Sequence, residues 1–331
     1  GVRLVGSEMC IRDRLSTLLV DWRESYKYEI DGVIVNHDKK YPRKSGNPDH
    51  AFAFKMILSD QMAEAKVIDV IWSASKDGFL KPKIRIEAIE LGGVTIEYAT
   101  AFNASFVKEN KLGIGAIVKI IRSGDVIPYI MDVTHPAPEA KMPNEEYKWN
   151  KTNVDIILKN ASTNKTVLMK SITYFFKDIG VSGLSSGNIK RIMDANYDSI
   201  PAILAMTKDD FLDVEGFKEK LATKIHTNIK EAIESTSLPT LMNASNIFGR
   251  GLGERKIAPI LEAYPDILTS DDDKSDKLEN VSELKGMGSI TAKAFVDNID
   301  EFITFLHDSN LEYKLNEGVK VKEYDLSLIH I

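Results

Sequence analysis

One pattern occurs four times in the second half of the chain and constrains the fold more than any other feature. Each copy has a glycine turn, a few polar residues and then an amphipathic helical segment. The copies are GVSGLSSGNIKRIMDA (180–195), VEGFKEKLATKIHTNI (214–229), GRGLGERKIAPILEAY (249–264) and LKGMGSITAKAFVDNI (284–299). Such a repeat predicts helical units that pack on one another. We therefore expect an all-α domain over residues 167–308.

The glycine turns indicate how this domain binds a ligand. They match the helix-hairpin-helix pattern, in which backbone N–H groups at a helix N-terminus hold a phosphate oxygen, independently of base sequence. A single such glycine would be weak evidence, because glycine also ends helices for reasons of backbone geometry. Several copies in one run favour DNA binding. The candidate DNA-binding glycines are Gly183, Gly216, Gly251, Gly253, Gly286 and Gly288.

Composition narrows the class of protein. The 331 residues are 43% hydrophobic and 28% charged, which is typical of a folded chain of two or three domains. The formal net charge of −6 means that nucleic-acid binding must come from local basic surfaces or backbone donors. We find no apolar run that is long enough for a bilayer span and no secretion signal. We therefore expect an intracellular protein that does not bind membranes.

The two ends of the chain differ in character from its middle. Residues 1–14, GVRLVGSEMCIRDR, and the closing LSLIHI (326–331) resemble read-through of sequencing adapters. We therefore expect a non-native start and a tail, 309–331, that ends in non-native residues. The remainder is expected to be an internal fragment of a longer reading frame. The single cysteine, Cys10, lies in the first of these ends and permits neither an internal disulfide nor a four-cysteine zinc site.

The segments before the repeats predict β structure. Residues 15–65 read as a short helix followed by two strands, YEIDGVIVN (28–36) and HAFAFKM (50–56). Residues 66–135 carry short alternating strands that suggest a small barrel. Residues 136–166 are polar and begin with prolines, which indicates a linker followed by a short ordered piece. Together with the helical repeats, these segments predict a multidomain α+β chain.

A carboxylate and an ammonium group stand on the first two predicted strands. Alternation places Glu29 and Asp31 on one face of the first strand, and it places Lys55 on the same face of the second strand as Ala51 and Ala53. The spacing leaves two interpretations open. The two charges form an ordinary ion pair at a sheet edge, or they face one pocket.

Longer motifs in the same region resemble those of a known family. YEIDGVIVN and AFAFKM resemble the last two nucleotidyltransferase motifs of the NAD-dependent DNA ligases. WSASKDGFLKPKIRIEAIELGGVTIEYAT, with GAIVKIIRSGDVIP, resembles the OB-fold that follows them there. The order of the parts also agrees. The resemblance implies that 15–65 is the end of an adenylation domain, that 66–135 is an OB-fold and that 167–308 is the helix-hairpin-helix domain.

The resemblance also implies an activity. The parent enzyme would seal nicks in duplex DNA during replication and repair, with NAD+ as AMP donor and Mg2+ as metal. A lysine–AMP intermediate forms, the AMP passes to the 5′-phosphate at the nick, and the 3′-hydroxyl displaces it. By the same resemblance, the hairpins and the OB-fold would grip the nicked duplex, with an affinity that depends strongly on salt. The resemblance further implies a cytoplasmic monomer, in bacteria or in virus-infected cells.

Individual residues take expected roles from the resemblance. Asp31 corresponds to an aspartate near the catalytic magnesium, and Lys55 corresponds to a lysine that contacts the adenylate phosphate. Glu29 and Gly32 complete the cofactor-binding set, since glycine lets the backbone approach the nucleotide closely.

The OB-fold contributes two candidate DNA contacts. Arg122 matches a family arginine on the DNA-facing surface, and Lys76 stands where the family often has arginine. Both are expected to bind phosphates.

The chain departs from the family pattern in three places. Asn36 stands where a lysine is usual. Residues 136–166 contain no cysteine, although the family carries a four-cysteine zinc finger there, so we expect a degenerate finger region that folds without zinc. No Lys-x-Asp-Gly motif with the nucleophilic lysine occurs, and KDG at 76–78 lacks the intervening residue. We therefore predict that this chain binds DNA without sealing it.

Two other classes of function stay open. The chain is alternatively a non-catalytic DNA-binding protein with an OB-fold and helix-hairpin-helix repeats, or a structure-specific partner in repair or recombination. The strands that carry Asp31 and Lys55 favour the ligase, because a pure binding protein has no need of this pair of charges.

Overall fold

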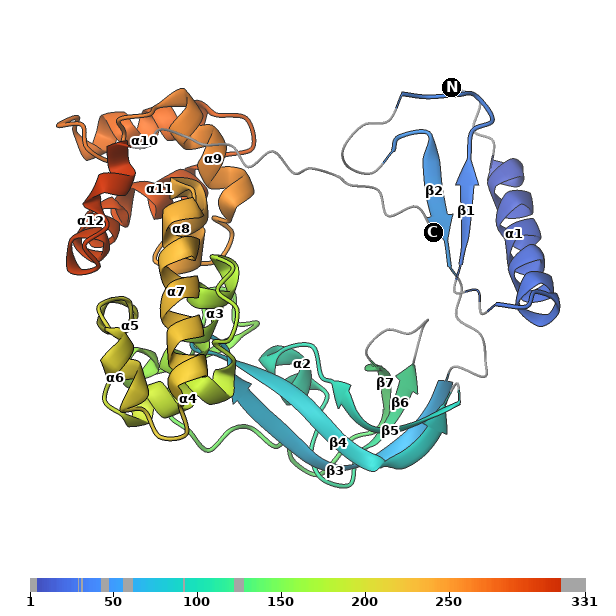
Figure 1. Cartoon of the computed structure of the whole chain (residues 1–331). Coiled ribbons are helices and arrows are strands. Elements are labelled where there is room, and N and C mark those ends of the chain that lie inside the picture. The colour runs from blue at the N-terminus through green and yellow to red at the C-terminus, as the bar shows by residue number, and fades with distance from the viewer. Residues whose placement is uncertain are drawn as a thin grey trace. The chain divides into compact units, whose positions relative to one another are not determined.

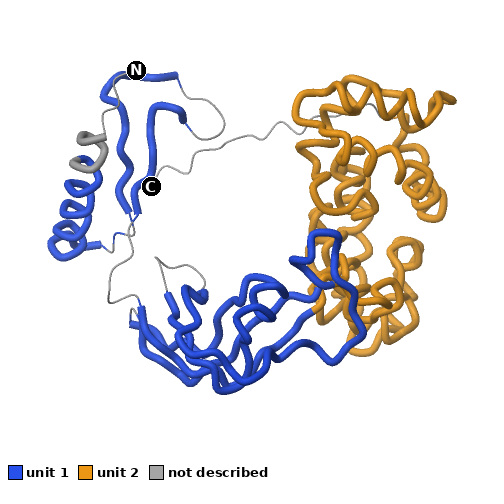
Figure 2. Tube along the Cα trace, turned by 180° about the vertical axis from the view of Figure 1, so that it is seen from behind, with its two compact units in different colours: residues 1–73, 80–156 blue, residues 74–79, 157–331 orange. Residues whose placement is uncertain are grey.

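The computed structural model describes residues 5–28, 30, 32–42, 48–55, 62–91, 93–121 and 128–316. The chain divides into two compact units (Figure 2). One unit comprises residues 1–73 and 80–156, and the other comprises residues 74–79 and 157–331. The turn at 74–79 therefore belongs with the helical part of the chain, although in sequence it lies inside the β-rich half.

The first unit begins with a helix and a two-stranded sheet (Figure 1). These elements are α1 (Val5–Ser25), β1 (Val33–Asn36) and β2 (Ala51–Phe54). The strands pair antiparallel, from Val33 opposite Phe54 to Asn36 opposite Ala51. The helix starts well before residue 15, and the paired strands are shorter than predicted. Glycine pairs poorly in strands, and Gly32 directly precedes the paired segment.

Five longer strands form the predicted small barrel. They are β3 (Met62–Ala74), β4 (Phe79–Leu91), β5 (Val94–Thr100), β6 (Ile117–Ile121) and β7 (Tyr129–His135). Their order is β3-β6-β7-β5-β4, and β3 also pairs with β4, which closes the ring. A short helix, α2 (Ala104–Glu109), lies between β5 and β6 in the chain. The arrangement confirms the OB-fold prediction.

Alternation along β4 shows why this sequence makes a barrel. Ile84 and Ile86 are 0% and 1% exposed, whereas Lys83 before them and Arg85 between them are exposed. Successive side chains in a strand point to opposite faces, so one face fills the interior and the other meets solvent.

Residues 136–166 contain short ordered elements after the polar start of the region. They are β8 (Tyr147–Trp149), β9 (Ile156–Leu158) and the 3-10 helix η2 (Ala161–Thr163). The N–H of Leu158 donates to the carbonyl of Gly78 over 3.0 Å. A Cβ on Gly78 would lie 2.5 Å from the Cβ of Ala161, and its φ is +76°. This close approach requires glycine in the KDG turn.

The rest of the second unit is helical, as predicted. Its helices are α3 (Lys165–Asp178), α4 (Ser186–Asp194), α5 (Ile200–Leu204), α6 (Lys208–Leu212), α7 (Glu219–Ser235), α8 (Leu238–Ser245), α9 (Glu254–Ala263), α10 (Lys274–Glu283), α11 (Ser289–Asp297) and α12 (Ile299–Asp308). The 3-10 helix η3 (Glu312–Asn316) follows. The acidic run 270–276 begins as a loop, and its last three residues form the first turn of α10.

The four sequence repeats fold as four helix pairs with one register. The pairs are α3 with α4, α6 with α7, α8 with α9, and α10 with α11. Each turn contains a glycine with positive φ, followed one, six and nine positions later by buried apolar residues. These are Leu184, Ile189 and Ile192 after Gly183; Phe217, Ala222 and Ile225 after Gly216; Leu252, Ile257 and Ile260 after Gly251; and Met287, Ala292 and Phe295 after Gly286.

Candidate nucleic-acid interface

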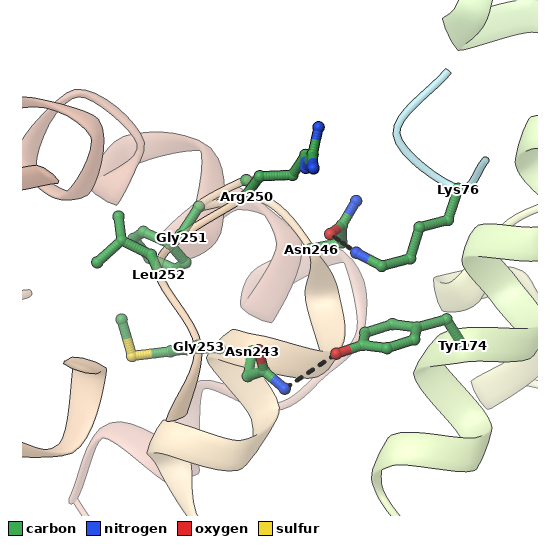
Figure 3. Close-up of a pocket in the computed structure, with 11 residues that line it drawn as sticks. Lys76, Tyr174, Asn243, Asn246, Arg250, Gly251, Leu252 and Gly253 are labelled. Carbon is green, nitrogen blue, oxygen red and sulfur yellow. Dashed lines mark hydrogen bonds between the residues drawn. The ribbon is translucent and has the colours of Figure 1, made fainter. Parts of the chain in front are cut away.

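A pocket of about 180 Å³ lies at the glycine turn before α9 (Figure 3). All of its lining residues belong to the second unit. The pocket brings together three residues singled out from the sequence, Lys76, Gly251 and Gly253. It also includes Arg250, whose guanidinium carbon lies 4.7 Å from the centre of the Phe79 ring. The cationic side chains of Lys76 and Arg250 therefore lie beside the turn that leads into α9, where backbone N–H groups stand at the start of the helix.

Side-chain hydrogen bonds join α8 to α3, and both helices contribute residues that line this pocket. Seven of the eight residues of α8 are buried, and the exception is Asn243. The side-chain amide of Asn243 donates to the Asp178 carboxylate over 2.7 Å and to the Tyr174 hydroxyl over 3.1 Å. Burial, followed by the charge of Asp178, raises the pKa of Tyr174 above its usual value. The phenol therefore stays neutral, and these contacts hold α8 against α3.

Lys76 is held at the edge of the pocket by neighbouring side chains. Its ammonium group donates to the side-chain oxygen of Asn246 and lies 3.2 Å from the Asp77 carboxylate and 4.3 Å from the centre of the Tyr174 ring. The side chain remains 25% exposed. The Asn246 amide in turn donates to Asp77 over 2.7 Å. The structure thus orients the Lys76 charge and ties the 75–79 turn to the end of α8.

Three of the four repeat helices start without a side-chain cap in the described structure. Helices α7, α9 and α11 follow Lys218, Gly253 and Gly288, and none of these N-cap residues makes a side-chain cap hydrogen bond. By contrast, the Ser185 hydroxyl accepts from the N–H of Asn188 at the start of α4. Uncapped N–H groups and the positive end of the helix dipole favour an anion at α7, α9 and α11.

The two glycines of the Gly-x-Gly turns differ in what the fold demands of them. Gly251 and Gly286 have φ of +95° and +86°, a conformation that favours glycine. Gly253 and Gly288 both have φ of −87°, which any residue adopts. A Cβ on Gly253 would make only an ordinary contact of 3.6 Å with Asn243, and a Cβ on Gly288 would meet nothing within 4 Å. The folded chain therefore has no steric need of glycine at these two positions.

At the end of the small sheet, Gly32 lies against Lys55. A Cβ on Gly32 would lie 2.8 Å from Cγ of Lys55 and 2.9 Å from the Phe54 carbonyl oxygen, so the position requires glycine. Glu29 and Asp31 lie outside the described residues, as does Arg122 in the barrel. Among the residues that are described, no group of three or more His, Cys, Asp or Glu side chains has the arrangement of a metal site. No described helix is long and apolar enough to cross a membrane.

Sequence reasoning missed the polar residues that support the pocket. Tyr174, Asn243 and Asn246 belong to no motif, and Asn246 is separated from its partner Lys76 by 170 positions. One signal was present, since Asn243 interrupts the otherwise buried segment of α8. A polar residue in such a segment requires hydrogen-bond partners, but the sequence does not identify them.

The barrel and its strand order define an OB-fold protein with a helical region after the barrel. Residues 64–142 match the family model of the NAD-dependent DNA ligase OB-fold domain. The chain is 40% identical over 314 residues to a DNA ligase of Acanthamoeba polyphaga mimivirus, covering 94% of this chain and 48% of the relative. It is also 30% identical over 320 residues to a DNA ligase of Clostridium tetani, covering 88% of this chain and 46% of that protein.

These matches confirm the family resemblance seen in the sequence. Over most of its length the chain is similar to proteins named DNA ligase, and residues 64–142 carry the OB-fold domain of the NAD-dependent DNA ligases. It spans about half the length of the curated relatives it matches.

Proposed function

We propose that this chain is the DNA-gripping portion of an NAD-dependent DNA ligase that seals nicks in duplex DNA. In this proposal residues 15–65 end the adenylation domain, 66–135 are the OB-fold, 136–166 replace the zinc finger, and 167–308 are a helix-hairpin-helix domain. The observation that carries the proposal is the presence of glycine at positions 253 and 288, where the fold itself does not need it.

A phosphate oxygen at the turns explains these glycines. The N–H groups at the start of α9 and α11 have no side-chain cap in the described structure, and a bare backbone lets an anion approach them closely. Lys76 and Arg250 add positive charge beside the α9 turn. In the first two repeats Gly183 and Gly216 would take the places of Gly251 and Gly286, whereas Ser185 and Lys218 stand where Gly253 and Gly288 do. Contacts of this kind position a duplex without reading its sequence.

The rest of the catalytic assignment also belongs to the proposal. NAD+ would supply AMP, and ligase–AMP and DNA–adenylate would be the intermediates. Lys55 would neutralise charge on the adenylate phosphate, which its place beside Gly32 supports. Asp31, with Glu29 near it, would lie at the Mg2+ site, and Arg122 would bind a DNA phosphate from the barrel.

The missing nucleophile sets a limit on what this chain does alone. Because the 331 residues contain no Lys-x-Asp-Gly motif, we expect no ligase–AMP from them. Incubation with NAD+ followed by intact-mass measurement should show no added AMP. A mass increase of one AMP would contradict this part of the proposal and leave the DNA-binding part intact.

DNA binding is tested with the variant that carries both Gly253→Ala and Gly288→Ala. We expect unchanged thermal stability and an affinity for nicked duplex that falls on the order of a hundred-fold, because charge-assisted hydrogen bonds at two turns are lost. The matched control is Gly187→Ala, since a Cβ there lies 3.8 Å from Ser185 and α4 already has a side-chain cap. Equal affinity of the double variant and the wild-type chain would refute the phosphate-binding role.

A further inference from the structure

The fourth repeat carries an apolar side chain in an unusual place. Ile290 is 86% exposed, more than any other described large apolar residue. It lies in the first turn of α11, directly after Gly288 and Ser289, and both of these residues are also exposed. An isoleucine in water loses the stabilisation that burial would provide, so its position on the turn that we propose to face DNA needs a physical account.

The common register of the repeats identifies the equivalent residues. Ile290 stands four positions after the positive-φ glycine Gly286. The same position after Gly216 holds Lys220, and after Gly251 it holds Arg255; both side chains are exposed. The two other repeats with uncapped helices therefore place a cation where the fourth places an isoleucine. In the first repeat, whose helix has a side-chain cap, the position is glycine.

We propose that Ile290 is an apolar DNA contact that packs against the deoxyribose edges of the minor groove. The inference rests on the proposed function, because it requires the α11 turn to bind a phosphate. Ile290 lies in the first turn of α11, close to the proposed phosphate. A side chain there reaches either the next phosphate or the sugar beside it. Lys220 and Arg255 suit phosphates. Ile290 suits the hydrocarbon surface of the sugar, because an apolar side chain gains free energy when it leaves water.

Under this assignment, DNA binding at the turn of the fourth repeat depends on salt differently from DNA binding at the turns of the second and third repeats. A cation at this position releases counterions from the DNA on binding, so its contribution weakens as salt rises. An apolar contact releases none and keeps its contribution at high salt. The fourth turn would then hold the duplex under conditions that loosen the other two.

The test is binding of nicked duplex by fluorescence anisotropy over a series of salt concentrations. We expect Ile290→Ala to weaken binding on the order of five-fold at every salt concentration, with an unchanged slope of log affinity against log salt. Ile290→Lys should steepen that slope by about 0.9, the value for one added phosphate contact. Lys220→Ala should make the slope shallower by a similar amount. Ile11→Ala, at an exposed isoleucine in α1, is the control and should bind as the wild-type chain does.

The outcomes separate the inference from the proposed function. If the wild-type chain binds no DNA, the proposed function fails. If the wild-type chain binds and Ile290→Ala binds equally well, only the inference is overturned. An unchanged salt slope in Ile290→Lys, with Lys220→Ala behaving as expected, would also overturn it, because the side chain would then lie away from the DNA.

Discussion

The side-chain amide of Asn246 donates a 2.7 Å hydrogen bond to the carboxylate of Asp77, across a separation of 169 residues. This bond joins the end of α8 to a turn that comes from the β-rich half of the sequence. The same Asn246 accepts from Lys76 and has a left-handed backbone, with φ of +61°. One side chain thus fixes both the cation and the chain segment that borders the glycine turn before α9.

Removing this side chain while keeping its backbone should loosen the pocket. Asn246→Gly tolerates the left-handed conformation and loses both side-chain hydrogen bonds. We expect the free energy of unfolding of the helical unit to fall by about 1–2 kcal/mol. Urea unfolding followed by circular dichroism measures this change. A stability equal to that of the wild-type chain would show that the bonds to Lys76 and Asp77 contribute nothing net.

The two glycines of the third turn should differ in their response to alanine. Gly251→Ala places a Cβ on a backbone with φ of +95°, so we expect a loss of about 1–2 kcal/mol. Gly253→Ala, with φ of −87°, should leave the free energy of unfolding nearly unchanged. Thermal melts of the two variants test the difference. Similar losses in both would mean that the second glycine is also a folding requirement.

The uncapped helices should be easy to stabilise. Lys218→Ser supplies a hydroxyl to the N–H groups at the start of α7, which have no side-chain cap, and we expect a gain of about 0.5–1 kcal/mol. The converse change, Ser185→Ala at the capped helix α4, should cost about 1 kcal/mol. In DNA binding, Lys218→Ser should be weaker than wild type, because the cap occupies the donors and a charge is lost. A stabilised variant with undiminished affinity would argue against phosphate binding at that turn.

The helical unit should lose stability in mild acid through His226. Burial lowers the pKa of His226 below its ordinary 6.5, and the charges of Lys230 and Lys208 act in the same direction. Unfolding restores the higher pKa, so the unfolded chain binds the proton more tightly. The free energy of unfolding that neutral His226 contributes is fully present above pH 6.5. It is lost as the pH falls from there through the pKa of the folded state. In urea titrations between about pH 7.5 and 5.5, His226→Gln should flatten this decline.

Residues 136–166, which we propose replace the zinc finger, should fold without metal. Residues 136–166 lack cysteine, and the turn between β8 and β9 is held by Asn150, whose side-chain oxygen accepts from the N–H groups of Val154 and Asp155 over 3.1 and 3.3 Å. We expect elemental analysis to find no stoichiometric zinc and a chelator to leave the unfolding midpoint unchanged. Asn150→Ala should lower that midpoint. One tightly bound zinc per chain would refute the prediction.

Local pattern accounts for what the sequence predicted correctly. The alternation of KIRIEAIEL predicted β4, because a strand half-buried in a barrel repeats every two residues. The four glycine turns predicted the four repeat helices, because each turn needs a residue that adopts positive φ and each helix needs an apolar stripe. The roles of Asp31, Glu29 and Arg122 stay predictions, since those residues lie outside the described structure.

Only the tertiary structure decided which of these local features meet. The sequence singled out Lys76 and Gly251 separately, and the fold places both at one pocket with Asn243, Asn246 and Tyr174. Neither helix periodicity nor strand alternation encodes a contact across 170 positions, because such contacts depend on how packed elements close on one another. The sequence by itself thus determined the elements and the family resemblance. Packing determined the site, since the hydrogen bonds that orient its charges form only after the helices have assembled.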